Sequence, residues 1–282
     1  MKNILVPIDF SQCSMDAFLY AKSLADTLGF SIKLVHVYKG NLNIDPSINL
    51  HSEKNQEEII LDKMNEFVKV NLENNKDSNI LTHQKIETEA IVGLNTTQQI
   101  VNLTSNKEDI AMVVIGKTGA GNVLDKMFGS ISSGVAQRSH CPVILVPQGT
   151  KYKDFENVLY ASNYESADED LVGQIIDFGN VFRATMHFVH VEENDNFENV
   201  EDTIFYKLFE KGDPAFSFNI VNIKNRSVLE GLNQYADENE VDLIVLVNRQ
   251  RNYLENIFQL SLTKKMAKAS KLPVMVFHIL NE

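Results

Sequence analysis

VVIGKTGAGNVLDKMFGSISSGVAQ, residues 113–137, leads from a short apolar run through a glycine-rich loop into a helical pattern. Gly116 closes the apolar run, Gly119 follows it, and Gly129-Ser130 comes just before the helix, in the pattern G-x2-G-x9-G-S. An apolar run with little alternation is typical of a parallel strand that is covered on both faces. A strand that passes through a loop into a helix therefore predicts a parallel α/β fold.

The glycine loop also predicts a site for a phosphate group. Glycines allow backbone N–H groups to approach phosphate oxygens, and they permit positive φ angles in tight turns. Ser130, Ile131 and Ser132 would open the next helix, whose N-terminal amides favour anions and whose serine hydroxyls add contacts. Ligands of an open parallel sheet bind beyond the carboxyl ends of its strands, where this loop falls. The alternative is that the glycines only shape a tight connection.

Two better-known phosphate motifs do not fit this loop. Gly116-Lys117-Thr118 resembles the end of a Walker loop, but the first glycine of that motif would fall on Ala111, inside the strand. The dinucleotide fingerprint has a different spacing and follows the first strand of a domain, whereas this loop follows the fourth. Lys117 and Lys126 have the length to reach a phosphate; the equally open alternative is that both are solvated loop lysines.

Strands and helices alternate on both sides of the loop. The helical spacing of apolar residues predicts helices at 14–28, 57–72, 96–105 and 130–139. They separate five short apolar runs in the order βαβαβαβαβ, which predicts a five-stranded parallel sheet with right-handed crossovers. Residues 39–56 are expected to form a surface loop.

The first half of the chain repeats in the second half. Residues 3–10 resemble residues 157–164, at an offset of 154 (157 − 3), and residues 34–37 resemble 188–191 at the same offset. Later segments pair at smaller offsets, so the second copy has shorter loops. These later pairs are 109–114 with 242–247 and 141–146 with 272–277. A polar linker at 148–155 is expected to join the two copies.

Four motifs together resemble the universal stress protein family, over essentially the whole chain and twice. They are VPIDFS in the first strand, LVHV in the second, the glycine loop, and the strand CPVILVP. The resemblance implies two tandem five-stranded parallel-sheet α/β domains of the Rossmann-like, adenine nucleotide alpha hydrolase-like type, covering residues 1–147 and 155–282. It also implies that Val143–Val146 and Val274–Phe277 pair side by side about a pseudo-twofold axis.

The same resemblance implies a nucleotide site in the first copy. In ATP-binding members of the family the first-strand Asp contacts the ribose or adenine, a second-strand Val backbone binds adenine, and the glycine loop wraps the phosphates. The implied ligand is ATP, or else AMP or ADP, with Mg²⁺ and with no side chain assigned to the metal. The implied nucleotide-binding residues are Pro7, Ile8, Asp9, Val37, Gly116, Gly119, Gly129, Ser130, Ile131 and Ser132.

Several of these residues also have a structural alternative. Asp9 could instead cap the following helix, although Ser11 is the better N-cap candidate. His36 and His190 are expected to be packed core histidines. Cys13 and Cys141 are expected to be small core residues.

The second copy is predicted to have lost the site. Its corresponding stretch, LVNRQRNYLENIFQLSLTKK at 246–265, contains no glycine, and side chains there would obstruct the approach of backbone to a phosphate. Arg249 and Arg251 clamping an anion is the weaker alternative. The predicted correspondences are Gly116 with Arg249, Gly119 with Asn252, Gly129 with Leu260, Ser130 with Ser261, Asp9 with Asn163 and Pro7 with Ala161.

Composition excludes several classes of function. The chain has 282 residues with 38 acidic against 26 basic, a formal charge of -12, which argues against a general nucleic-acid-binding surface. No apolar run reaches the roughly 18 residues that span a bilayer, so no membrane association is expected. Two cysteines without a Cys-x-x-Cys pair argue against a disulfide framework or a zinc site. Without a signal-peptide pattern, the expected compartment is the cytoplasm.

The resemblance, together with the glycine loop and Asp9, implies a stress-response adenine-nucleotide binding protein whose occupancy alters contacts with an unidentified protein partner. A slow ATP hydrolase is one alternative. The sequence offers no convincing general base for it and no arginine finger in the first-half loop, and Asp125 is the closest carboxylate candidate. An apo scaffold or small-molecule carrier without nucleotide is the other alternative. Association of two chains into a homodimer is left open.

Overall fold

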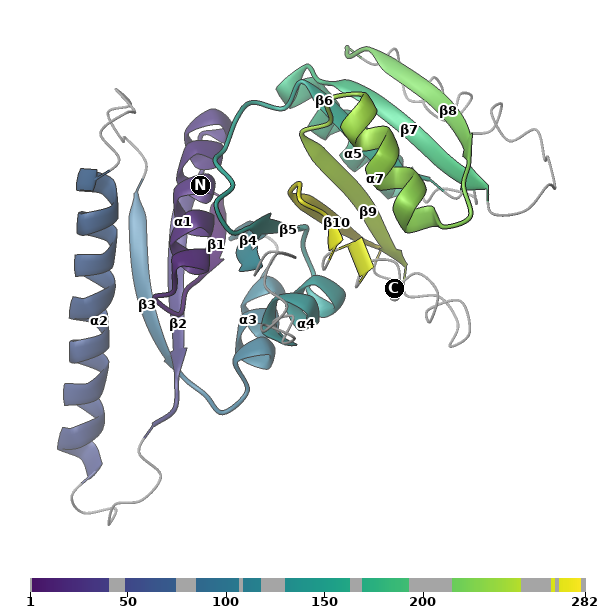
Figure 1. The fold of residues 1–282 in the computed structure, drawn as a ribbon. Coiled ribbons are helices and arrows are strands. Elements are labelled where there is room, and N and C mark those ends of the chain that lie inside the picture. The colour runs from purple at the N-terminus through teal and green to yellow at the C-terminus, as the bar shows by residue number, and fades with distance from the viewer. Residues whose placement is uncertain are drawn as a thin grey trace. The chain divides into compact units, whose positions relative to one another are not determined.

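A computed structural model describes residues 2–40, 49–74, 85–106, 109–117, 130–162, 169–192, 215–249, 265–266 and 269–279. Contacts divide the chain into two compact units, and the change from the first to the second falls between Tyr152 and Lys153. Both units are built around a parallel sheet (Figure 1).

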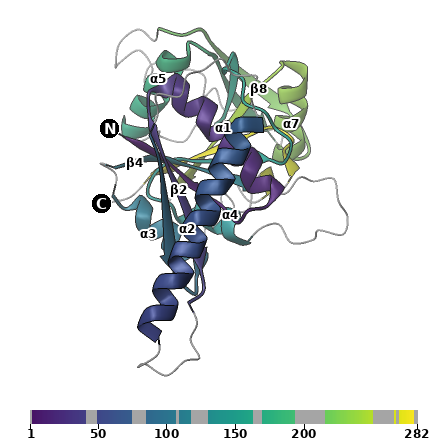
Figure 2. The same cartoon turned by 90° about the vertical axis from the view of Figure 1, so that its left-hand side faces the viewer.

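The sheet of the first unit has the strand order β3-β2-β1-β4-β5, with all neighbours parallel. Its strands are β1 (Asn3–Pro7), β2 (Ser31–Tyr38), β3 (Ile86–Val92), β4 (Ile110–Lys117) and β5 (Val143–Pro147). Its helices are α1 (Gln12–Leu28), α2 (Asn49–Asn74), α3 (Thr96–Thr104) and α4 (Ser130–Arg138). In Figure 1, α1 and α2 lie on one face of this sheet and α3 and α4 on the other. Figure 2 shows α1 and α2 in front of β2 and β4.

The sheet of the second unit has the order β10-β9-β6-β7-β8, again with all neighbours parallel. Its strands are β6 (Asn157–Ala161), β7 (Thr185–Glu192), β8 (Phe218–Lys224), β9 (Leu243–Arg249) and β10 (Val274–Ile279). The helices described in it include α5 (Glu169–Phe182) and α7 (Val228–Glu238). Among the described residues, none of the helices combines the length and the apolar character that crossing a membrane requires.

The predicted fold class is confirmed: each half holds a five-stranded parallel sheet with helices. The predicted loop at 39–56 is wrong in its later part, because α2 begins at Asn49 and not at Glu57. Residues 41–48 of that loop lie outside the described residues. The pairing of the domains about a pseudo-twofold axis stays a prediction.

The first helix begins and ends where its capping residues predict. The Ser11 side chain is the N-cap and accepts a hydrogen bond from Ser14 N, as expected of a serine at that position. Gly29 ends the helix with φ 68°, a left-handed conformation that glycine adopts without a steric penalty. Between these caps α1 buries Ala17, Phe18 and other apolar residues against the sheet, and this fixes the direction in which the segment after β1 runs.

The duplication is visible in matching hydrogen bonds at positions 154 residues apart. His36 Nδ1 on β2 lies 2.8 Å from the carbonyl oxygen of Ile8, just after β1. His190 Nδ1 on β7 lies 2.9 Å from the carbonyl oxygen of Ser162, just after β6. In each unit, the histidine thus forms a hydrogen bond that links the second strand to the residue just after the first strand. Both histidines are half-buried, so the expectation of packed core histidines is met only in part.

The strand registers correct one predicted correspondence. Val146 and Phe277 match in sequence, and they pair with Gly116 and Val247 respectively. Val247 therefore occupies the position of Gly116, and the predicted match of Gly116 with Arg249 is wrong. The register of β4 against β1 shifts near the start of β4. The predicted match is displaced by two residues (249 − 247), and the extra residue of this bulge accounts for one of them.

The predicted linker at 148–155 is docked at both ends. It begins with a turn in which Thr150 N donates to Pro147 O at 3.1 Å and Gly149 has φ 80°. Gly149 N donates to the Asp16 carboxylate on α1 at 2.6 Å. In the second unit, Phe155 is 2% exposed and its ring packs against Phe178 and Phe182 of α5. The first residues of the linker are thus packed on the first unit, and its last residue is packed in the second unit.

Candidate functional site

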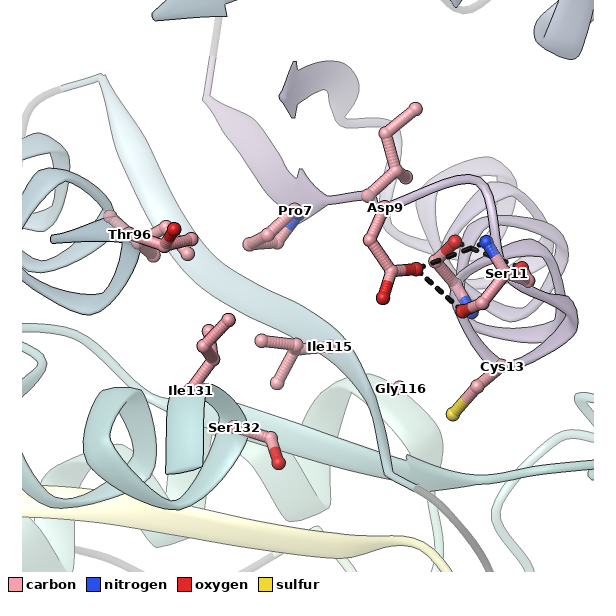
Figure 3. Close-up of a pocket in the computed structure, with 12 residues that line it drawn as sticks. Pro7, Asp9, Ser11, Cys13, Thr96, Ile115, Gly116, Ile131 and Ser132 are labelled. Carbon is pink, nitrogen blue, oxygen red and sulfur yellow. Dashed lines mark hydrogen bonds between the residues drawn. The ribbon is translucent and has the colours of Figure 1, made fainter. Parts of the chain in front are cut away.

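A pocket of about 170 Å³ lies at the carboxyl ends of β1 and β4 in the first unit. It is lined by Pro7, Ile8, Asp9, Ser11, Cys13, Ser14, Thr96, Ile100, Ile115, Gly116, Ile131 and Ser132. Thr96, Ile131 and Ser132 lie across the pocket from Asp9 and Ser11, with Ile115 between the two sides (Figure 3). This is the edge of a parallel sheet at which ligands generally bind.

Asp9 is held at the rim by the start of α1. Its Oδ1 accepts a hydrogen bond from Ser11 N at 3.0 Å and a second one from Ser11 Oγ (Figure 3). Burial alone would raise the pKa of Asp9, but hydrogen bonds from Ser11 and Ser14 outweigh it and hold the pKa below its usual value. The carboxylate is therefore ionised at neutral pH, when it can only accept hydrogen bonds.

Gly116 lies where β4 meets the first turn of α1. A Cβ added there would fall 2.4 Å from the Cys13 carbonyl oxygen and 2.8 Å from Cys13 Sγ. Real Cβ atoms do not approach backbone this closely, so the close packing of α1 on β4 requires a glycine. The structure thus gives Gly116 a packing role, in addition to the open backbone that the glycine loop predicts.

The first turn of α4 forms the opposite side of the pocket. Ser130 begins the helix, and the side chains of Ile131 and Ser132 line the pocket. Ser132 is 4% exposed, whereas Ile131 is 38% exposed. The N-terminal turn of a helix presents unpaired backbone N–H groups and the positive end of the helix dipole, so this side of the pocket favours an anion.

An apolar wall completes the pocket, and the sequence interpretation missed part of it. Ile100 of α3 and Ile115 of β4 are buried and line the pocket together with Ile131. Thr96 stands at the start of α3, where Asn95 caps the helix by accepting a hydrogen bond from Gln98 N. The apolar spacing of α3 predicts its buried face, but only the topology brings its first turn to the ends of β1 and β4.

The structure brings six of the ten predicted site residues together. They are Pro7, Ile8, Asp9, Gly116, Ile131 and Ser132. Val37 lies in β2 and is not among the residues that line the pocket. Gly119 and Gly129 lie outside the described residues, as do Asp125, Lys126 and the second-half residues Asn163, Arg251, Asn252, Leu260 and Ser261. For Ser130 the structure gives the backbone as the first residue of α4.

Lys117 and Cys13 form a buried titratable pair behind Gly116. Lys117 is the last residue of β4 and is 2% exposed, so it is not a solvated loop lysine. Burial lowers the pKa of Lys117 to about 8. Burial also raises the pKa of the Cys13 thiol to about 11, and the nearby charges of Asp9 and Asp16 add to this. A thiol with this pKa is protonated at neutral pH and is a poor nucleophile.

Within the described residues, no group of three or more His, Cys, Asp or Glu side chains could hold a metal ion. The described part of the pocket instead offers one carboxylate, several hydroxyls and a helix N-terminus. Such a set suits a ligand that offers hydroxyl donors on one side and an anionic group on the other.

The family model described as the universal stress protein family matches residues 1–147 and 213–278. A universal stress protein of Methanocaldococcus jannaschii is 27% identical over 151 residues, covering 53% of this chain and 84% of that protein. A solved universal stress protein of Archaeoglobus fulgidus has a TM-score of 0.72 at 17% identity, covering 98% of each chain. Another solved structure is a universal stress protein in complex with cAMP, with a TM-score of 0.38 at 19% identity, covering 52% of this chain and 98% of that chain.

Proposed function

The chain belongs to the universal stress protein family, and on that premise we propose that its first domain, residues 1–147, binds one adenine nucleotide. The proposed ligand is ATP with Mg²⁺. The second domain, residues 155–282, is proposed to be a degenerate copy. In this proposal, nucleotide bound in the first domain alters the contacts of the chain with a protein partner.

One observation carries the proposal: a single pocket gathers the end of β1, the end of β4 and the first turn of α4. These three segments are far apart in sequence, and they include six of the residues that the family resemblance implies for the nucleotide. The pocket combines isoleucine side chains, a carboxylate and a helix N-terminus, and these suit the different parts of a nucleotide. The isoleucine wall suits the flat face of a base, and Asp9 suits the hydroxyls of a ribose.

The anionic end of the nucleotide is assigned to the first turn of α4. Ser132 lines the pocket there, and the helix N-terminus favours a phosphate over a neutral group. Mg²⁺ bound to a nucleotide is held largely by phosphate oxygens and water, with one or two carboxylates at most. The lack of an acidic cluster among the described residues is therefore compatible with Mg²⁺ entering together with ATP.

Binding is favoured over hydrolysis by the state of Asp9, the one carboxylate among the described residues that line the pocket. A general base works best when its pKa lies near the operating pH. The pKa of Asp9 is lowered, so its carboxylate is a weaker base than an ordinary aspartate. Asp9 is therefore assigned to holding the nucleotide.

The test is calorimetric titration of ATP with Mg²⁺ into the intact chain, beside two matched variants. Asp9→Ala removes the proposed ribose acceptor and should weaken binding by roughly 10- to 100-fold, which is the loss of a hydrogen bond to a charged group. Asp26→Ala is the control, because it removes the same charge from the far end of α1, where Asp26 pairs with Lys22. It should bind as the wild type does.

Wild-type binding near one nucleotide per chain, weakened only by Asp9→Ala, supports the proposal. No detectable binding at millimolar ATP would end it. Equal weakening in both variants would contradict the role given to Asp9, because it would point to a general effect of charge on the fold.

A further inference from the structure

Phe10 has a backbone conformation that aromatic residues rarely adopt. Its φ angle is 65°, in the left-handed region, where the Cβ crowds the following carbonyl. Two other described non-glycine residues share this feature, Arg183 and Glu240, and both follow the end of a helix, where a left-handed residue is common. Phe10 stands between β1 and α1, next to the pocket. Strain of this kind persists only when the surroundings over-determine it.

The conformation of Phe10 closes the turn that fixes Asp9. The carboxylate of Asp9 reaches across Phe10 to accept hydrogen bonds from Ser11 N, at 3.0 Å, and from Ser11 Oγ. Ser11 in turn caps α1. Rotation of Phe10 to a negative φ would move Ser11 relative to Asp9, so both hydrogen bonds depend on the backbone of Phe10.

Side chains outside the pocket hold Phe10 in place. Its ring centroid lies 4.7 Å from that of His36 on β2 and 5.9 Å from that of Phe67 on α2. Lys63 Nζ, also on α2, lies 4.1 Å from the ring centroid, within reach of a cation–π contact. His36 also bonds the carbonyl of Ile8, on the other side of Asp9. Both chain neighbours of Asp9 are therefore anchored on β2 and α2.

We propose that Phe10 is the positioning residue for Asp9: its ring, held by His36, Phe67 and Lys63, keeps the backbone left-handed, and this aims the carboxylate at the ligand. This inference rests on the proposed nucleotide site and deepens it. It makes nucleotide affinity depend on α2, a helix that contributes none of the described residues that line the pocket. Phe10 itself is not in contact with the pocket space and acts through Asp9.

Two substitutions separate positioning from simple packing. Phe10→Ala removes the ring and keeps a Cβ that disfavours the left-handed backbone, so the turn should open. Phe10→Gly removes the same ring but adopts this φ without a steric penalty. We expect Phe10→Ala to weaken ATP binding by about 10-fold, as for loss of an oriented charged hydrogen bond, and Phe10→Gly to weaken it less. If the ring only filled space, both variants would retain wild-type affinity.

The decisive experiment is a double-mutant cycle on the intact chain. ATP affinity is measured calorimetrically for wild type, Phe10→Ala, Asp9→Ala and the double variant. Since Phe10 acts through Asp9, the double variant should bind no more weakly than Asp9→Ala, whereas independent roles would give additive losses. Phe178→Ala is the matched control, because it truncates another half-buried phenylalanine in the second unit and should leave affinity unchanged.

A second measurement needs no nucleotide. The pKa of the Asp9 carboxyl, followed by NMR in the ligand-free chain, is expected to be lowered in wild type and in Phe178→Ala. In Phe10→Ala it should rise, because the hydrogen bonds from Ser11 are lost while burial remains. An unchanged pKa of Asp9 in Phe10→Ala, or additive losses in the cycle, would overturn the inference. Absence of ATP binding in wild type would refute the proposed function alone, and the pKa would still decide the role of Phe10.

Discussion

Gly116 is constrained by the helix behind it as well as by any ligand in front of it. A Cβ at this position would lie 2.4 Å from the Cys13 carbonyl oxygen, and backbone cannot yield as a flexible side chain does. The first turn of α1 would have to move away from β4. We expect Gly116→Ala to lower the free energy of unfolding by about 1–3 kcal/mol, the usual effect of overpacking, as measured by urea denaturation.

Gly149 offers the contrasting case for that measurement. It has φ 80°, and an added Cβ would meet nothing within 4 Å. Asparagine tolerates a left-handed backbone better than most residues. Gly149→Asn meets no packing conflict and bears only the backbone strain, so it should lower the free energy of unfolding by about 1 kcal/mol or less. If Gly116→Ala were as stable as wild type, α1 would not be packed on β4 as closely as the structure has it.

At the level of single residues, the sequence predicts the kind of site better than it predicts which residues line the pocket. The motif around Asp9 and the serines of α4 could be found from their order along the chain. Thr96 and Ile100 could not, because nothing in the local pattern of α3 says that its first turn meets β1. For the same reason, the sequence explains only part of why a glycine stands at position 116. The contact with Cys13, about a hundred residues earlier, follows only from the packed fold.

At the scale of elements, two hydrogen bonds attach the linker to α1, and together they form what we call the linker clamp. Asp16 accepts a hydrogen bond from Gly149 N at 2.6 Å, and Tyr152 OH donates to Thr27 Oγ1 at 3.2 Å at the far end of the same helix. Asp16→Ala removes the first of these bonds. We expect the Gly149 amide to exchange with solvent about 10-fold faster, since a charged hydrogen bond contributes on the order of 1.5–3 kcal/mol. Exchange is followed by NMR.

Gln12→Ala controls for this change. Gln12 also bonds the Asp16 carboxylate, at 2.9 Å, but it contributes nothing to the linker. Its loss should leave the exchange of Gly149 close to that of wild type. Equal acceleration in both variants would mean that fraying of α1, and not the clamp, controls the linker.

Elements were predictable where the pattern was strong. The alternation of strands and helices and the start of α1 at its serine cap follow from apolar spacing and capping. The early start of α2 at Asn49 was missed, because its first turns lack an apolar stripe that distinguishes a helix from a polar loop. The predicted correspondence between β4 and β9 is wrong by two residues, and a bulge in β4 accounts for one of them, because its extra residue leaves no mark on composition.

At the scale of the whole chain, the two copies agree at one end of the first strand and differ at the site. The histidine bonds that follow β1 and β6 are alike, at 2.8 and 2.9 Å. At the position of Gly116, however, the second copy has Val247. A side chain there is incompatible with the close approach of helix to strand seen at Gly116. Duplication has thus preserved the framework, and the proposed loss of the second site follows from changes at the carboxyl ends of the strands.

This divergence predicts how the chain responds to its nucleotide in hydrogen exchange followed by mass spectrometry. ATP with Mg²⁺ stabilises only the part of the chain that binds it, by about 2.7 kcal/mol at a hundred times the dissociation constant. Peptides from residues 109–117 and 130–147 should therefore gain protection, and peptides from residues 215–249 and 269–279 should not. A contradicting result would be that ATP protects both regions and that the second region keeps its protection in Asp9→Ala. The second domain would then hold a site of its own and would not be degenerate. If the second region lost its protection in Asp9→Ala together with the first, a single site would stabilise both domains.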